Sequence, residues 1–201
     1  KQKIEWVKHN MPILRQIEDD FRKHQYFSGL RVLVCIHLEA KTAYLAKVFA
    51  AGGAEVAVTG SNPHSTKDDV VAALAEEGMH VYARYGATPE EIRQYMNRAL
   101  DVRPNIMIDD GGDIAELLHT ERQELLPEVL GACEETTTGV LRAKARAKAG
   151  VLEFPVVLIN DARCKYLFDN YHGTGQSVWD GVMRTTNLVV SGKTVVIIGY
   201  G

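Results

Sequence analysis

Short apolar runs alternate along this chain with longer amphipathic segments. The runs are rich in Val and Ile and apolar at both odd and even positions, which is typical of strands covered on both faces. Their alternation with helical segments predicts an α/β fold of three layers, a doubly wound and mostly parallel sheet between helices. The predicted strands are residues 31–36, 54–59, 79–83, 105–108, 155–159 and 194–198.

Two of the intervening helices carry capping signals. Thr88 is followed by a first-turn proline and by Glu91, the pattern of a capping box. Ser65, with Asp68 three residues later, predicts a second capped helix, which we expect to end at Gly78. Both helices fall between predicted strands, as crossover connections do.

Short polar residues follow four of the predicted strands at the point where each strand ends. In an open parallel sheet, ligands bind at the carboxyl ends of the strands, near the point where the strand order reverses. The polar clusters therefore predict a small-molecule site. They are residues 37–42, 61–66, 109–113 and 160–161.

The composition narrows the class of partner. The 201 residues are 46% hydrophobic and 24% charged with a net charge of −3, so neither nucleic acid nor a membrane is expected as a partner. The sequence shows no apolar run near the ~20 residues that span a bilayer and no signal-peptide layout. Cys35, Cys133 and Cys164 fit neither a disulfide framework nor a metal knuckle, which favours a reducing cytoplasm.

Both ends of the chain lead us to expect a longer protein. The first residue is not Met, and the last three, Gly-Tyr-Gly, follow the apolar run 194–198. A buried strand ending in Gly-x-Gly begins a dinucleotide-binding turn. We therefore expect one domain over residues 1–188, and the hinge and first strand of a dinucleotide-binding domain over 189–201, with the helical segment 174–190 as the hinge candidate.

Acidic residues and histidines supply candidate chemistry. The DDGGD run at residues 109–113 suits a hard cation, but EF-hand spacing is missing, so we predict no metal and a turn that aims carboxylates into a cleft. A carboxylate among others in such a cleft has a raised pKa, which suits a general base. His37 follows a strand two residues before Glu39 and is an acid–base candidate, although a lone His is more often a core residue. His64 is a weaker candidate, and His119 is predicted to be structural.

The strongest functional signal is the run Glu-Glu-Thr-Thr-Thr-Gly at residues 134–139, together with Lys165, Asp169 and Asn170. The three threonines alone fit a solvated loop with a helix cap. The whole set is costly to gather near a core unless it has a chemical role. With Asn-Asp at 160–161 and Gly-Thr-Gly-Gln-Ser at 173–177, the chain resembles the S-adenosylhomocysteine hydrolases over nearly its whole length, and among them the compact archaeal or thermophile-type branch.

The resemblance implies a tightly bound NAD, a nucleoside thioether substrate and a homotetramer at full length. In that family the ribose 3′-hydroxyl is oxidised, homocysteine is eliminated, water adds to the alkene, and reduction releases adenosine. The cofactor is expected to arrive from residues after Gly201, so the 201-residue chain alone is expected to show no turnover.

Residue roles follow from spacing and from the resemblance. Lys165 with Asp169, at i,i+4 helical spacing, is expected to take the hydroxyl proton. The resemblance assigns the C4′ and C5′ proton transfers to Asp109 and His37 and the ribose hydroxyls to Glu135. It also assigns substrate binding to Glu39, Lys41 and Thr42, and cofactor binding to Thr136, Thr137, Thr138, Asn170, Gly199 and Gly201.

Two lysines depart from the family pattern and keep alternatives open. Many members have, where Lys41 stands, a Glu that accepts from the adenine amino group, whereas Lys has only donors and suits O6 of hypoxanthine. Lys67 replaces a Gln that helps gate the site. The alternatives are an S-inosylhomocysteine hydrolase and a catalytically silent relative that binds a nucleotide or a partner protein. A Rossmann dehydrogenase fits poorly, because its glycine fingerprint follows the first strand.

Overall fold

The centre of the fold is one parallel sheet. In the computed structural model, which describes residues 1–199, six strands lie in the order β3-β2-β1-β4-β5-β6, and every neighbouring pair is parallel. This order confirms the doubly wound α/β fold expected from the sequence. The strands are β1 (Arg31–Ile36), β2 (Glu55–Gly60), β3 (His80–Tyr82), β4 (Ile106–Asp109), β5 (Gly131–Glu134) and β6 (Val156–Leu158).

The strand predictions are correct except at two places. The prediction missed β5, because Gly-Ala-Cys-Glu has no β-branched residue to mark it as a strand. The predicted strand 194–198 is wrong: these residues form neither helix nor strand, and Ile197 and Ile198 are exposed. A strand needs a neighbour for its backbone hydrogen bonds, and no strand within residues 1–199 pairs with this segment.

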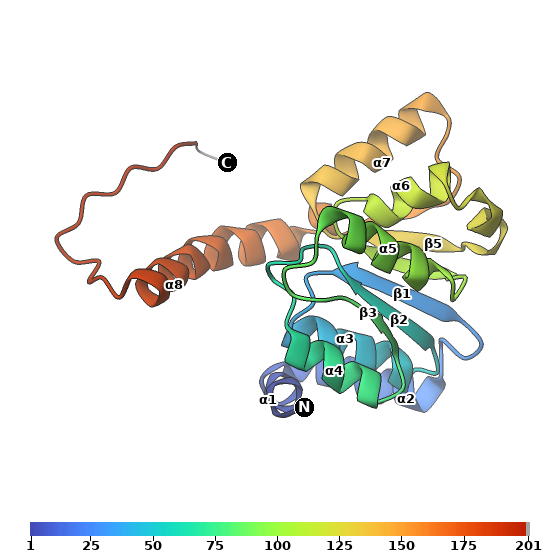
Figure 1. Cartoon of the computed structure of the whole chain (residues 1–201), viewed down its shortest axis with the longest axis horizontal. Coiled ribbons are helices and arrows are strands. Elements are labelled where there is room, and N and C mark those ends of the chain that lie inside the picture. Colours follow the sequence, from blue (N-terminus) through green and yellow to red (C-terminus); the bar gives the residue numbers. More distant parts are fainter. Residues whose placement is uncertain (200–201) are drawn as a thin grey trace. The chain divides into compact units, whose positions relative to one another are not determined.

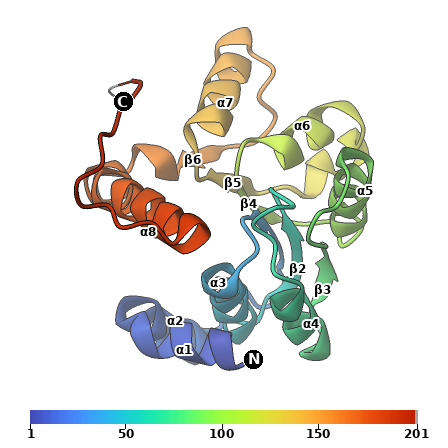
Figure 2. The same ribbon diagram turned by 60° about the vertical axis from the view of Figure 1, so that its left-hand side comes forward.

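Helices cover both faces of the sheet, as Figures 1 and 2 show. Val32 and Val34 of β1 point into the core under α1, α3 and α4, while Leu33 and Cys35 point into the core on the other face, under α5 and α6. This alternation explains why the strands are apolar at both parities. The helices of this part are α1 (Gln2–Asn10), α2 (Pro12–His24), α3 (Ala40–Ala51), α4 (Asp68–Glu76), α5 (Pro89–Leu100), α6 (Asp113–Thr120), the 3-10 helix Gln123–Glu128 and α7 (Thr137–Ala149).

Of the two predicted caps, one forms. Thr88 Oγ1 accepts from the Glu91 N–H at 3.3 Å, and Glu91 Oε2 accepts from the Thr88 N–H at 2.8 Å, which confirms the capping box of α5. The Ser65 cap is wrong, because α4 begins at Asp68 and the Ser65 hydroxyl is used in the loop after β2. The helix stops at Glu76, and Gly78 closes it with a φ of +87°, a conformation that favours glycine.

A buried carboxylate ties the first three helices together. Glu18 of α2 is 4% exposed and accepts hydrogen bonds from Lys8 of α1 at 2.8 Å, Arg22 at 2.7 Å and the Tyr44 hydroxyl of α3 at 2.7 Å. Burial raises the pKa of Glu18, but the bonds from Lys8, Tyr44 and Arg22 outweigh burial and leave the pKa below its usual value.

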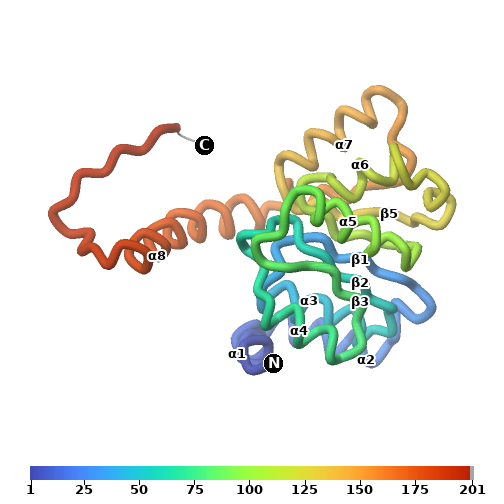
Figure 3. Tube along the Cα trace, viewed as in Figure 1, coloured from blue at the N-terminus to red at the C-terminus, as the bar shows by residue number. Residues whose placement is uncertain are grey.

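The chain divides into two compact units, residues 1–159 and 160–201. The second unit contains a π-helix (Lys165–Gly173) and α8 (Thr174–Thr186), and a short 3-10 helix (Ile159–Asp161) spans the division. The trace after α8 forms neither helix nor strand as far as residue 199 (Figure 3). The expected domain boundary at residue 188 stays a prediction. None of the helices in residues 1–199 is both long and apolar enough to cross a membrane.

Candidate active site

Three of the four polar clusters, residues 37–42, 61–66 and 109–113, meet where the strand order reverses. The sheet grows from β1 through β2 and β3 to one edge, and then from β4 through β5 and β6 to the other. The carboxyl ends of the neighbouring strands β1 and β4 therefore flank the position where ligands bind in open α/β sheets. His37 follows β1, Ser61 follows β2 and Asp110 follows β4.

His37 is the centre of a network that joins three loops. Its Nδ1 lies 2.6 Å from Ser65 Oγ, and its Nε2 lies 3.4 Å from Asp110 Oδ2. Ser61 Oγ donates to the same Asp110 oxygen at 2.8 Å. Ser65 Oγ also donates to the Asn62 carbonyl at 3.0 Å, so its lone pairs can accept from Nδ1, and Nε2 is the nitrogen that faces Asp110. The ring is half exposed, so this nitrogen can meet a ligand.

The loop after β1 is held by two of its own predicted site residues. Glu39 Oε1 accepts from the backbone N–H groups of Lys41 at 2.9 Å and Thr42 at 3.3 Å, which caps α3. Thr42 Oγ1 donates to the His37 carbonyl. Glu39 and Thr42 thus position His37, whereas Lys41 is exposed in the first turn of α3. The roles of the three residues in substrate binding stay predictions.

Asp109 and Asp110 occupy different environments. Asp109, the last residue of β4, is 2% exposed, and its carboxylate accepts from the backbone N–H groups of Asp110 at 3.0 Å and Ala115 at 3.1 Å. Burial, helped by the nearby Glu134 and Asp113 carboxylates, raises the pKa of Asp109 to about 7. Asp110, which the sequence did not single out, is the residue that contacts His37.

Glu134 belongs to the run at residues 134–139, but the sequence interpretation gave it no role of its own. It ends β5, opposite Asp109 in the strand register, and is 3% exposed. Its Oε1 accepts from the backbone N–H groups of Gly111 at 2.9 Å and Thr136 at 3.0 Å, and burial raises its pKa. A Cβ at residue 139 would lie 2.0 Å from the Glu134 carboxyl carbon, so Gly139 leaves the space that this carboxylate fills. Gly139, in the first turn of α7, was the feature of the sequence that could have indicated a buried Glu134.

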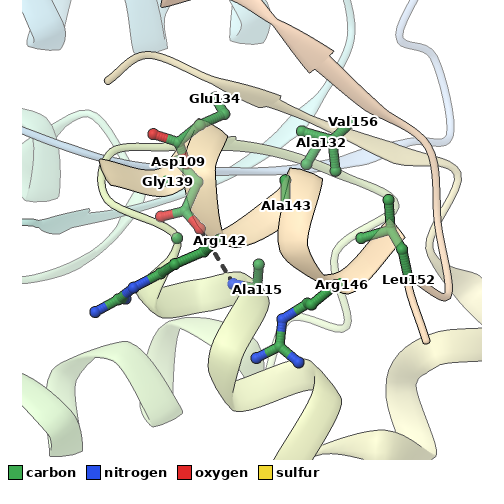
Figure 4. Close-up of a pocket in the computed structure, with 11 residues that line it drawn as sticks. Asp109, Ala115, Ala132, Glu134, Gly139, Arg142, Ala143, Arg146, Leu152 and Val156 are labelled. Atoms are coloured by element: carbon green, nitrogen blue, oxygen red, sulfur yellow. Dashed lines mark hydrogen bonds between the residues drawn. The ribbon is translucent and has the colours of Figure 1, made fainter. Parts of the chain in front are cut away.

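A pocket lies between β5, α6 and α7, and its lining includes neither His37 nor Asp110 (Figure 4). The carboxylates of Asp109 and Glu134 line one part of it, Arg142 and Arg146 of α7 line another, and small apolar side chains complete it. Within residues 1–199 no cluster of three His, Cys, Asp or Glu side chains is arranged to hold a metal ion.

The remaining predicted residues of the first unit follow β5. The Glu135 N–H donates to the Asp109 carbonyl at 3.0 Å, and the Glu135 side chain is partly exposed. Thr136 is the N-cap residue of α7, but its side chain makes no capping hydrogen bond. Thr137 and Thr138 are exposed in the first turn. Three hydroxyl groups thus surround the start of a helix next to Glu135.

The other predicted residues belong to the second unit. Lys165, Asp169 and Asn170 share the π-helix, so the expected α-helical spacing of Lys165 and Asp169 is replaced by a wider turn. Lys165 Nζ donates to Asn160 Oδ1 at 2.9 Å, and within residues 1–199 no ion pair joins it to Asp169. Gly199 has a φ of +107°, and Gly201 lies outside the described residues.

The sequence profile of the S-adenosyl-L-homocysteine hydrolase family matches residues 1–126 and 121–195. The chain belongs to this family. The resemblance drawn from residues 134–139 and 165–170 is therefore confirmed.

The curated relatives of this chain carry two different names. It is 57% identical to an adenosylhomocysteinase of Pyrococcus abyssi, over 99% of this chain and 47% of that protein. It is 55% identical to an adenosylhomocysteinase of Thermococcus kodakarensis, over 100% and 48%. It is 54% identical to an S-inosyl-L-homocysteine hydrolase of Methanocaldococcus jannaschii, also over 100% and 48%. The chain thus spans about half the length of the curated relatives it matches.

Proposed function

We propose that the full-length protein hydrolyses S-adenosyl-L-homocysteine reversibly to adenosine and L-homocysteine. The observation that carries the proposal is the 3.4 Å approach of His37 Nε2 to Asp110 Oδ2 at the reversal of strand order, in a chain of this family. A His and a carboxylate that face each other at a ligand position can exchange protons with a substrate near neutral pH.

Each proton transfer of the proposed reaction is assigned to particular residues. His37 and Asp110 serve the C4′ and C5′ positions in this proposal, and the Asp109 carboxylate supports Asp110 by accepting from the Asp110 backbone N–H. Glu135, which follows β5, binds the ribose hydroxyls. Lys165, with Asp169 in the same π-helix, takes the proton of the 3′-hydroxyl. An amine can do so near neutral pH when its surroundings lower its pKa.

The residues around the start of α7 fit the NAD that the family implies. Thr136, Thr137 and Thr138 offer hydroxyls beside backbone N–H groups that a helix start leaves without intrahelical partners, and such a position suits ribose and carboxamide groups. Asn170 and the Gly199 turn would contribute from the second unit. When bound, NAD would accept a hydride from the ribose and return it at the end of the turnover.

Two purine bases are candidates for the substrate. Lys41 carries only donors, and relatives with about equal identity are named for adenosyl and for inosyl substrates. S-inosyl-L-homocysteine is therefore the second candidate. The same proposal includes a homotetramer and a cytoplasmic location, the latter because three free cysteines suit a reducing compartment.

The test is homocysteine release by the full-length protein, with NAD present and each thioether nucleoside offered in turn. We expect release from at least one of them, and a loss of ~10²–10⁴-fold in His37→Ala and in Asp110→Asn. Glu55→Gln, which changes a half-exposed carboxylate at the opposite end of β2, is the control and should be as active as the wild type. Binding of both nucleosides without release of homocysteine would favour the catalytically silent alternative.

A further inference from the structure

Asp110 stands directly before a pair of glycines. It is followed by Gly111 and Gly112, which have φ values of +103° and +77°. Glycine loses more conformational freedom on folding than any other residue, so a pair of glycines beside a site residue needs external contacts to hold one conformation. The direction of the Asp110 carboxylate towards His37 therefore depends on what binds this turn.

Gly111 is bound on both sides. Its N–H donates to Glu134 Oε1 at 2.9 Å, and its carbonyl accepts from Arg142 Nη1 at 2.9 Å. Glu134 comes from β5 and Arg142 from α7, so two separate elements hold the residue next to Asp110. Arg142 Nη1 also donates to Asp113 Oδ1 at 2.7 Å, which anchors the start of α6.

The burial of Glu134 is hard to explain by stability alone. A carboxylate that is 3% exposed loses most of its hydration, and here hydrogen bonds from two uncharged groups, the backbone N–H groups of Gly111 and Thr136, replace it. The space for it exists only because residue 139 has no side chain. These two N–H groups belong to the loop that carries Asp110 and to the loop that carries Glu135.

We propose that Glu134 and Arg142 are positioning residues of the reaction, a brace that holds Gly111 from both sides and so aims the Asp110 carboxylate at His37. The inference rests on the proposed function, in which Asp110 moves protons. Neither residue of the Gly111 brace needs to touch the substrate; each acts through Asp110.

The chain offers a matched pair of variants for Arg142. Arg146 lies one turn later on α7 and, like Arg142, pairs with an acidic residue of α6, in its case Glu116. Only Arg142 also bonds Gly111. In the full-length protein we expect Arg142→Ala to lower kcat ~10-fold or more with little change in KM, because small misplacements of a catalytic group have large effects on rate. Arg146→Ala should leave kcat unchanged.

Glu134 allows a rescue test. Both N–H bonds go to the same oxygen, so Glu134→Gln keeps an acceptor for both, whereas Glu134→Ala keeps none. We expect Glu134→Gln to retain most of kcat and Glu134→Ala to lose ~10–100-fold. A role in overall stability alone would lower the melting temperature in both alanine variants without this pattern in kcat.

Hydrogen–deuterium exchange by mass spectrometry on the same full-length proteins separates the two proposals. Peptides that cover residues 109–115 should exchange faster in Arg142→Ala and Glu134→Ala than in the wild type or Arg146→Ala. Equal kcat in Arg142→Ala and Arg146→Ala, or unchanged exchange in both alanine variants of the brace, would overturn the inference. If the wild type releases no homocysteine but the exchange pattern is as expected, the proposed function is rejected, while the role of Glu134 and Arg142 in holding Gly111 is retained.

Discussion

Asp109 and Asp110 are adjacent in the chain, but their side chains lie in different environments. One side chain points into the pocket under α7 and is buried, and the other points to His37. The buried carboxyl has a pKa of about 7, which is far above the ~3.9 of an unfolded Asp.

This difference predicts how stability changes with pH. Between about pH 4 and pH 7 the folded chain holds a proton on Asp109 that the unfolded chain has lost, so the free energy of unfolding should fall as the pH rises through this window. The raised pKa of Glu134 acts in the same direction. Urea denaturation at several pH values should give a flatter pH dependence for Asp109→Asn than for the wild type; equal slopes would show that Asp109 does not hold the proton.

Lys41 makes a prediction about the substrate base. An ammonium facing O6 of hypoxanthine makes a charge-assisted hydrogen bond, whereas facing the adenine amino group it meets another donor. In the full-length protein, Lys41→Glu should shift the ratio of kcat/KM for adenosyl over inosyl substrate upwards by ~10-fold or more. Lys41→Met removes the donor without adding an acceptor, so its kcat/KM ratio should lie between those of the wild type and Lys41→Glu. A ratio that is the same in all three would mean that Lys41 does not contact the base.

At the scale of elements, α7 packs closely on β5 at one residue. A Cβ at Gly139 would lie 2.0–2.3 Å from the Glu134 carboxyl group, so Gly139→Ala should destabilise the chain by ~1–3 kcal/mol even though Ala favours a helix by up to ~1 kcal/mol. Gly181 of α8 is the control: an added Cβ there meets none of the described atoms within 4 Å, and Gly181→Ala should be neutral or stabilising. The denaturation midpoints of the two variants test this prediction, and equal midpoints would contradict the close contact between Gly139 and Glu134.

Glu18 joins the first three helices through hydrogen bonds from Lys8, Arg22 and Tyr44. The pKa of Glu18 is lowered in the folded chain, so its contribution is present above the unfolded pKa of ~4.3 and is lost as the pH falls through the folded value. Glu18→Ala would leave the buried Tyr44 hydroxyl without its acceptor, at a cost of ~1–3 kcal/mol at neutral pH. The deficit relative to the wild type should shrink in acid. Glu5→Ala on α1, whose carboxylate is 63% exposed, should have little effect.

At the scale of the whole molecule, the proposed reaction assigns one proton transfer to Lys165. Lys165 belongs to the second unit, whereas His37 and Asp110 belong to the first. In the full-length protein Lys165→Ala should bind adenosine but should reduce the nicotinamide ~10²–10⁴-fold more slowly, as followed by absorbance after mixing with adenosine. Lys193→Ala, an exposed lysine of the same unit, is the control. Reduction at the normal rate would assign the proton to another group.

The sequence by itself determined the layers of the fold and the family. Apolar runs of five to six residues predict strands such as β1 and β2, because strands covered on both faces must be apolar at every position. The capping box at Thr88 predicts the start of α5, because all of its groups lie within one helical turn. Such signals are local, and a sequence shows them completely.

Only the tertiary structure decided which polar residues come together at the candidate site. It selected Asp110 over Asp109 to face His37 and buried Glu134, because side-chain direction at a strand end depends on the register with neighbouring strands. It also left residues 194–198 without a strand, since an extended segment needs a partner that its own sequence does not supply. These contacts join residues far apart in the chain, and their geometry exists only once the sheet has formed.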